Sequence, residues 1–212
     1  MKKALFVCAA VVVMAGLVSA PAAAATKFNL GVKAGVSIAN NAWDDDDGSE
    51  HSLVKPTFGI FGVINLSSNF AIQPEVNYLM TGEWWLDSFD TIEYKDVEIY
   101  SYLHIPILAK YRFGTMGKVT PVVFAGPAIG FLLSAHAKSY ENGTLTDDSN
   151  IKSFFKSTDF GADFGAGVEF PIGKFKILVD ARYYLGLTNA VPSKPGWSMK
   201  SRSFIFTAGI IL

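Results

Sequence analysis

Apolar and polar side chains alternate strictly along residues 158–170. One face of this segment carries Thr158, Phe160, Ala162, Phe164, Ala166, Val168 and Phe170. The other face carries Asp159, Gly161, Asp163, Gly165, Gly167 and Glu169. Because successive side chains of a strand point to opposite faces, the pattern predicts a strand with one apolar face and one acidic, glycine-rich face.

Similar segments recur along the chain and predict eight strands, near residues 28–39, 56–66, 70–81, 98–113, 119–135, 158–170, 174–187 and 201–212. Two of them, 56–66 and 119–135, are apolar on both faces, so some of their side chains are expected to fill an interior. Proline normally argues against a central strand. We therefore expect Pro74, Pro106, Pro121 and Pro127 at bulges or near strand ends.

The connections between these strands alternate in length. Residues 67–69, 114–118 and 171–173 form short turns, whereas residues 40–55, 82–97, 136–157 and 188–200 form long polar connections. Bacterial outer-membrane barrels show this alternation, with short periplasmic turns and longer extracellular loops. A soluble sandwich has no reason for it. The prediction is an all-β fold, an eight-stranded antiparallel up-and-down transmembrane β-barrel with both chain ends on the periplasmic side.

The first residues predict export. Lys2 and Lys3 precede an apolar run at residues 4–18, and small residues follow at 19–25. This is the layout of a secretory signal peptide. We expect cleavage after Ala25, which leaves residues 26–212 as the barrel domain; the short apolar run disfavours a retained membrane anchor. Cys8 is the only cysteine, so the expected mature part has no disulfide or thiol chemistry.

Composition agrees with a membrane barrel. Half of the residues are hydrophobic and 14% are aromatic, yet residues 122–133, the longest apolar stretch after the signal, are interrupted by Gly126, Pro127 and Gly130. A membrane-spanning helix needs about 20 apolar residues, so a closed barrel is the remaining way to cross a bilayer. A net charge of −1 without a basic stripe disfavours a nucleic-acid partner.

The predicted inward faces carry charges of both signs: Lys33, Glu75, His104, Lys110, Arg112, Asp159, Asp163, Glu169, Asp180 and Arg182. Eight strands enclose an interior just wide enough for side chains, and buried charges must be paired. We therefore predict a plug of ion pairs, in which Lys110, Arg112 and Arg182 neutralise the acids of residues 158–170. A narrow or gated polar channel is the alternative.

Six motifs follow one another along the chain: Lys55-Pro-Thr-Phe-Gly-Ile-Phe-Gly62, Phe70-Ala-Ile-Gln-Pro-Glu-Val-Asn-Tyr78, Tyr102-Leu-His-Ile-Pro-Ile-Leu-Ala-Lys-Tyr-Arg-Phe113, Val123-Phe-Ala-Gly-Pro127, Phe164-Gly-Ala-Gly-Val-Glu169 and Asp180-Ala-Arg-Tyr-Tyr184. Together they resemble the PorT-like outer-membrane β-barrel family of the Bacteroidetes type. The resemblance implies a small, OmpA/OmpX-like barrel in the cell outer membrane and permits a secretion-linked role. His104 departs from the acidic residue usual in the family, and Leu212 departs from a terminal aromatic.

The long connections hold other candidates. The acidic run at residues 43–50 lacks the ligand spacing of a calcium-binding EF-hand loop, so we expect a solvated loop. Trp84, Trp85 and Trp197 are expected to be interfacial anchors, with a carbohydrate or protein platform as the alternative. His51 and His104 are scattered, and we predict no metal or cofactor site.

An enzyme is the other class considered. Ser134 and His136 lie two residues apart on one strand face, and Glu141, Asp147 and Asp148 follow, so a hydroxyl, a base and an acid could approach one another. Neither residue lies in a recognised catalytic signature. We therefore predict a non-enzymatic protein with no catalytic residues; a lipid-modifying enzyme that uses Ser134 and His136 is the alternative.

The predicted role is structural or interactive: envelope integrity, adhesion, or scaffolding of a surface or secretion complex. The expected partners are outer-membrane lipid and lipopolysaccharide, the barrel-assembly machinery, and proteins that bind the four extracellular loops.

Overall fold

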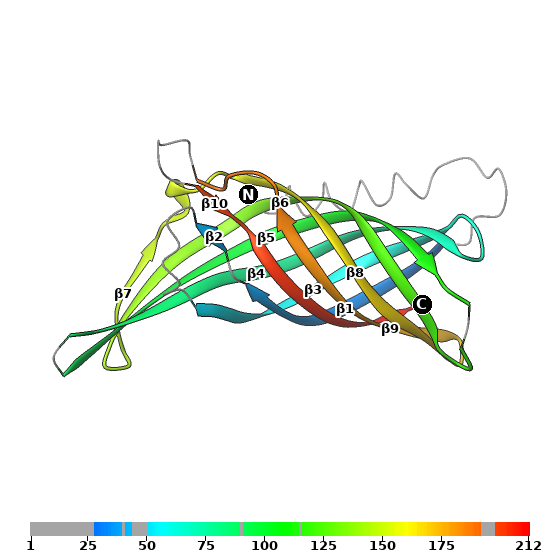
Figure 1. Ribbon diagram of the computed structural model, residues 1–212, viewed down its shortest axis with the longest axis horizontal. Coiled ribbons are helices and arrows are strands. Elements are labelled where there is room, and N and C mark those ends of the chain that lie inside the picture. The colour runs from blue at the N-terminus through cyan, green and yellow to red at the C-terminus, as the bar shows by residue number, and fades with distance from the viewer. Residues whose placement is uncertain (1–27, 40, 44–50, 90, 115, 192–197) are drawn as a thin grey trace.

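Eight long antiparallel strands close into a barrel in the computed structural model, which describes residues 28–39, 41–43, 51–89, 91–114, 116–191 and 198–212 (Figure 1). They are β1 (Phe28–Ala39), β3 (His51–Asn65), β4 (Phe70–Phe89), β5 (Ile92–Arg112), β6 (Thr120–Glu141), β8 (Thr158–Ile172), β9 (Phe175–Gly186) and β11 (Arg202–Ile211). Each strand pairs with the next in this order, and β11 pairs with β1 to close the ring. The predicted all-β, eight-stranded barrel is confirmed.

Four small elements lie at one end of the ring. β2 (Ala42–Trp43) pairs with β10 (Met199–Lys200), β7 (Thr144–Asn150) pairs with β6, and η1 (Lys152–Phe154) follows β7. The short turns lie at the opposite end, where β1 begins and β11 ends (Figure 1). In outer-membrane barrels the short-turn end is periplasmic. The predicted signal peptide, residues 1–25, lies outside the described residues. Within the part of the chain that is described, no helix is long and apolar enough to cross a membrane.

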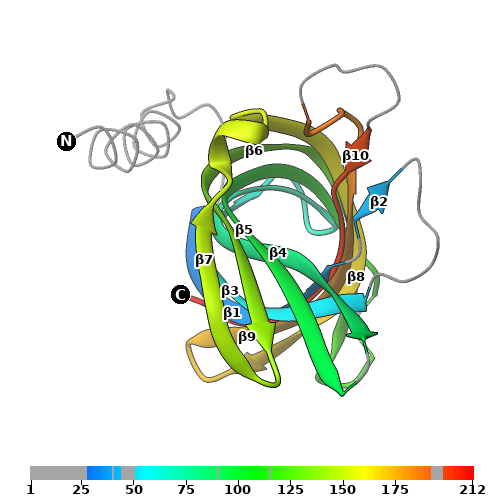
Figure 2. The same ribbon diagram turned by 90° about the vertical axis from the view of Figure 1, so that its left-hand side faces the viewer.

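Two of the predicted long loops consist largely of strands, although residues 151–157 are not part of one. β4 continues to Phe89 and β5 starts at Ile92, so residues 82–89 pair with residues 92–99 in a hairpin that projects from the barrel (Figures 1 and 2). β6 likewise continues to Glu141 and returns as β7. Asn142 and Gly143 both have positive φ, 48° and 79°, as a tight hairpin turn requires. The expectation of loops was wrong because, beyond the buried residues Glu83 and Val97 at its base, both faces of this extension meet water, so no continuous apolar face marks it.

The two faces of the strands separate as predicted. On β8, Phe160 and Phe164 are exposed on the outer surface, whereas Asp159, Asp163 and Glu169 are buried inside. The two strands that are apolar on both faces also fill the interior, as expected. Their inward residues join a buried cluster of Phe61, Val63, Ala71, Leu108, Val122, Phe124, Leu178 and Ile211.

The prolines coincide with gaps in the strand ladders. Pro74, Pro106 and Pro127 lie in short stretches that are skipped by the β3–β4, β4–β5 and β5–β6 ladders, respectively. Pro121 is the second residue of β6. Because proline has no backbone N–H to donate, these positions tolerate it. The pairing register is the same on both sides of each gap, so Pro74, Pro106 and Pro127 lie inside strands without a bulge and the expectation for them was wrong. Pro121, near a strand end, confirms it.

Candidate functional site

The barrel interior holds a large group of charged side chains. All ten ionisable residues predicted to point inward are buried, with at most 8% of each exposed. They form ion pairs and hydrogen bonds at successive levels along the barrel axis. Each acid has at least one hydrogen-bond partner there, as a charge needs when it is removed from water, although one oxygen of Asp163 has none among the described residues.

The central group joins opposite walls of the barrel. Glu75 on β4 accepts hydrogen bonds from Lys33 Nζ at 2.5 Å and from Arg182 Nη1 at 2.8 Å. Arg182 lies on β9 and also contacts Asp180, with Nη2 3.0 Å from Oδ1. Since β4 and β9 are separated by three strands in either direction around the ring, the Glu75–Arg182 pair crosses the whole lumen.

Neutral groups complete the coordination of Glu75. The side-chain amides of Gln73 and Asn77 donate to its two carboxylate oxygens at 2.7 and 2.9 Å. The Arg182 guanidinium also lies over the ring of Phe124, 4.9 Å from its centroid. Glu75 is thereby held by four side chains, whereas the amide oxygens of Gln73 and Asn77 are buried without a hydrogen-bond partner in the part of the chain that the structure describes.

Three cations were predicted to neutralise the acids of β8, and two of them, Lys110 and Arg112, do so. Glu169 accepts from Lys110 Nζ at 2.8 Å and from Arg112 Nε at 3.1 Å, which confirms that prediction. The expected pairing of Arg182 with these acids was wrong: its hydrogen bonds go to Glu75 and Asp180. Asp163 instead contacts His104, with Nε2 2.8 Å from Oδ2.

Asp159 is held by hydroxyl groups. Tyr184 donates to it at 3.0 Å and Thr188 at 2.8 Å. Tyr184 also lies edge-on to His104, with the ring centroids 4.7 Å apart. The sequence interpretation did not name Tyr184 as an interior residue. Its inward position could have been predicted, because it follows Asp180 and Arg182 at the two-residue spacing of one strand face.

An apolar layer covers the polar network at the extracellular end. Tyr100, Tyr102, Leu132 and Ala135 of the barrel wall pack with Ala190, Val191 and Met199, which lie in or beside the β9–β11 connection. Phe155, which follows η1, meets Tyr100 edge-on with centroids 4.9 Å apart. Below this layer, a cavity of about 10 Å³ lined by Asn77, His104 and Arg182 has room for about one water molecule.

The proposed catalytic pair is only partly assembled. His136 Nδ1 lies 3.0 Å from Asp148 Oδ1, and Lys138 Nζ lies 3.3 Å from Asp148 Oδ2. The hydrogen bond with His136 lowers the pKa of Asp148 below its usual range. Asp147 accepts from Ser149 at 2.6 Å. Among the described residues, no hydrogen bond joins Ser134 to His136, so a base and an acid meet without the nucleophile.

The remaining candidates lie at the extracellular end. Trp84 stacks on His51 with centroids 4.3 Å apart, and Lys95 Nζ lies 4.3 Å from the Trp84 ring. Asp44–Asp47 and Trp197 lie outside the described residues. Within the described ranges, no group of three or more His, Cys, Asp or Glu side chains is placed to hold a metal ion.

Several solved structures resemble this chain. Neisserial surface protein A has 16% sequence identity and a TM-score of 0.47, with 87% of this chain and 96% of that chain covered. Ail, the attachment invasion locus protein of Yersinia pestis, in complex with the heparin analogue sucrose octasulfate, has 14% identity and a TM-score of 0.42, with 88% and 99% covered. The outer membrane enzyme PagL has 15% identity and a TM-score of 0.37, with 84% and 97% covered.

Among curated proteins, none matches this chain. A family model does: residues 19–191 match the outer membrane protein beta-barrel domain. This match extends over most of the sequence and agrees with the closed ring of strands. The chain therefore belongs to the outer membrane protein beta-barrel domain family, and its place is the cell outer membrane.

Proposed function

We propose that this barrel conducts no solute and serves as a membrane-anchored platform for interactions at the cell surface. The observation that carries the proposal is the Glu75–Arg182 pair, whose hydrogen bond of 2.8 Å crosses the lumen. The apolar layer around Tyr100 covers this network on the extracellular side. A narrow channel would require both obstacles to move.

The interacting element would be the extracellular extension of β4, β5, β6 and β7. It projects beyond the ring (Figure 1), and every residue of β7 is exposed. A paired sheet presents side chains from a firm backbone, which suits recognition of a protein or surface partner. Adhesion, envelope integrity and scaffolding of a secretion complex all fit such a platform, and the six PorT-like motifs support the last.

The test has two measurements, one on the purified full-length protein and one in whole cells. In planar lipid bilayers we expect no stable conductance steps, and reproducible steps would contradict the closed lumen. In whole cells, crosslinking followed by pull-down should recover partners with the wild-type protein. Removal of residues 86–93, the tip of the β4–β5 hairpin, should lose those partners while the protein stays in the outer-membrane fraction.

An enzymatic role is the second candidate, because His136 and Asp148 form a base–acid pair. We propose that it does not operate, since His136 is 40% exposed and shares no hydrogen bond with Ser134 in the described part of the chain. Loss of lipid modification in both Ser134→Ala and His136→Ala variants, with the barrel intact, would establish the enzyme instead.

A further inference from the structure

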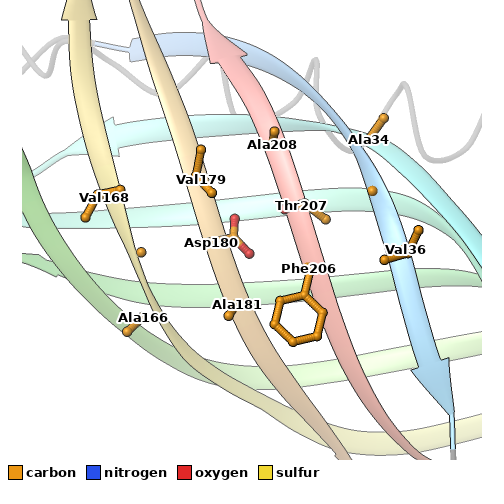
Figure 3. Close-up of a pocket in the computed structure, with 12 residues that line it drawn as sticks. Ala34, Val36, Ala166, Val168, Val179, Asp180, Ala181, Phe206, Thr207 and Ala208 are labelled. Carbon is orange, nitrogen blue, oxygen red and sulfur yellow. The ribbon is translucent and has the colours of Figure 1, made fainter.

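The outer surface of β8, β9, β11 and β1 holds an apolar groove of about 650 Å³ (Figure 3). Alanine lines it on all four strands, at Ala166, Ala181, Ala208 and Ala34, and Phe206 lies along its edge. Asp180 and Thr207 line the groove with their backbone only, because both side chains are buried inside the barrel. The groove is thus a hollow in a surface that otherwise carries large exposed side chains.

An aromatic row borders this groove on the extracellular side. Phe204, Tyr183 and Phe164 are aligned across β11, β9 and β8 by the strand register. Their ring centroids lie 4.7 Å apart for Tyr183 and Phe204, and 5.6 Å apart for Phe164 and Tyr183. Exposed apolar side chains continue on both sides of the groove along these strands, at Phe160 and Phe204 toward the extracellular end and at Phe175 and Ile210 toward the other end, so the groove lies within the lipid-facing apolar band. The groove therefore lies at the depth of acyl chains.

Basic side chains lie beyond the aromatic row. Arg202, two residues before Phe204 on the outer face of β11, is exposed, and so are Lys200 and Lys156. Lys156 belongs to the same rim, because its backbone N–H donates to Ala190 O at 2.7 Å. No Asp or Glu occurs from residue 181 to residue 212. The other extracellular connections all contain acids, and one of them, residues 40–55, meets this sector where β2 pairs with β10. Residues 181–212 are therefore the part of the rim whose own charged side chains are all basic.

The spacing between cations and groove fits one kind of molecule. Arg202 precedes Phe206 by four residues, about 13 Å along a strand at about 3.4 Å per residue. With a strand tilt of about 40°, the groove lies about 10 Å deeper in the membrane than the basic rim. A lipid whose phosphate contacts the rim has acyl chains that reach this depth, since half of the hydrocarbon core is about 15 Å thick.

We propose that this sector binds one lipid A moiety of lipopolysaccharide, with a phosphate on Lys200 and Arg202 and an acyl chain in the alanine-lined groove. Lipid A matches both features, because it is anionic, carries several acyl chains, and occupies the leaflet on the extracellular side. Cations near a membrane surface each contribute about 1 kcal/mol to the binding of anionic lipid. The site is separate from the extracellular extension and does not depend on the proposed function.

The test is native mass spectrometry of the full-length protein in micelles with diphosphoryl lipid A. We expect the wild type to retain one lipid A. Lys200→Glu/Arg202→Glu should weaken retention at least about tenfold, and Ala181→Phe, which fills the groove, should also weaken it. Two matched controls should retain lipid A: Lys118→Glu on a periplasmic turn, and Ala109→Phe, which lines a second groove on β4–β6.

Three results would overturn the proposal. The charge-reversed protein could retain lipid A like the wild type, Ala181→Phe could have no effect, or the wild type could retain phosphatidylglycerol or dephosphorylated lipid A equally well. Inorganic phosphate should not compete, because it lacks the acyl chain. Folding of each variant is checked by heat-dependent migration in gels, and Ala181→Val replaces Ala181→Phe if the larger side chain prevents barrel formation.

Discussion

Glu75 and Arg182 stand on opposite walls of the barrel, and their side chains meet in its centre, with Oε2 2.8 Å from Nη1. They are 107 residues apart in the sequence. Neither side chain has more than 1% of its surface exposed. This pair links β4 to β9 directly, without passing through the strands that lie between them around the ring.

Removing the cation of this pair should destabilise the barrel. In an Arg182→Leu variant, Glu75 and Asp180 lose a shared cation inside the lumen, and breaking a buried pair in this way costs about 3–5 kcal/mol. We expect the free energy of unfolding of the micelle-bound protein, measured in urea, to fall by that amount. Arg202→Leu, which removes the same side chain from an exposed position, should change stability little.

The double variant Glu75→Leu/Arg182→Leu separates charge pairing from packing. Glu75 also pairs with Lys33, and Arg182 also pairs with Asp180. The double variant therefore leaves one cation and one acid in the lumen instead of a net excess of acid, so part of the lost stability should return. A double variant as unstable as the sum of the two single variants would show that the pair contributes no coupling.

Gly126 marks a place where two strands approach too closely for a side chain. A Cβ atom at this position would lie 1.9 Å from the carbonyl oxygen of Ile107 on β5. Gly126→Ala should therefore force the strands apart and destabilise the barrel by about 1–3 kcal/mol. Gly114→Ala is the matched control, because nothing lies within 4 Å of a Cβ there. Equal unfolding midpoints for the two variants would contradict the close approach.

Much of this barrel can be predicted from the sequence, because the face to which a strand side chain points depends only on its position along its own strand. A two-residue period separates lipid-facing from inward side chains without any knowledge of neighbouring strands. That is why Asp163 on β8 and Arg182 on β9 could both be placed inside. The choice of partner is not local. It depends on register and on which walls face each other, so Arg182 was assigned to the wrong acids.

The extracellular end was predicted less well for a different reason. Towards the tip of the β4–β5 hairpin, residues 86–89 are exposed on both faces, so the strands leave no apolar period to detect. The apolar cover also has no period, because Ala190 and Val191 lie in a connection between strands. Pairing with an existing strand edge, rather than side-chain pattern, determines structure there.

A substitution at Phe155 should destabilise the apolar layer at the extracellular end of the lumen. Its ring meets Tyr100 edge-on with centroids 4.9 Å apart, a contact that contributes about 0.5–1.5 kcal/mol beyond burial. Phe155→Ala should accelerate hydrogen exchange of residues 151–157 while the barrel strands keep their protection. Phe154→Ala is the control, since Phe154 is 66% exposed. Unchanged exchange in Phe155→Ala would show that the cover is held by other contacts.

The β6–β7 hairpin should respond to acid before the barrel does. His136 and Lys138 on β6 both contact the Asp148 carboxylate on β7, and the hydrogen bond with His136 is the main cause of its lowered pKa. A carboxyl group with a lowered pKa in the folded state stabilises that state above its ordinary pKa, near 4. The contribution is lost as the pH falls through the lowered value.

Once corrected for the intrinsic pH dependence of exchange, amide protection in residues 144–150 should therefore fall below about pH 4. An Asp148→Asn variant should show weaker protection of these amides at neutral pH and no further loss over that range. Protection that falls with pH equally in both proteins would assign the effect to another group.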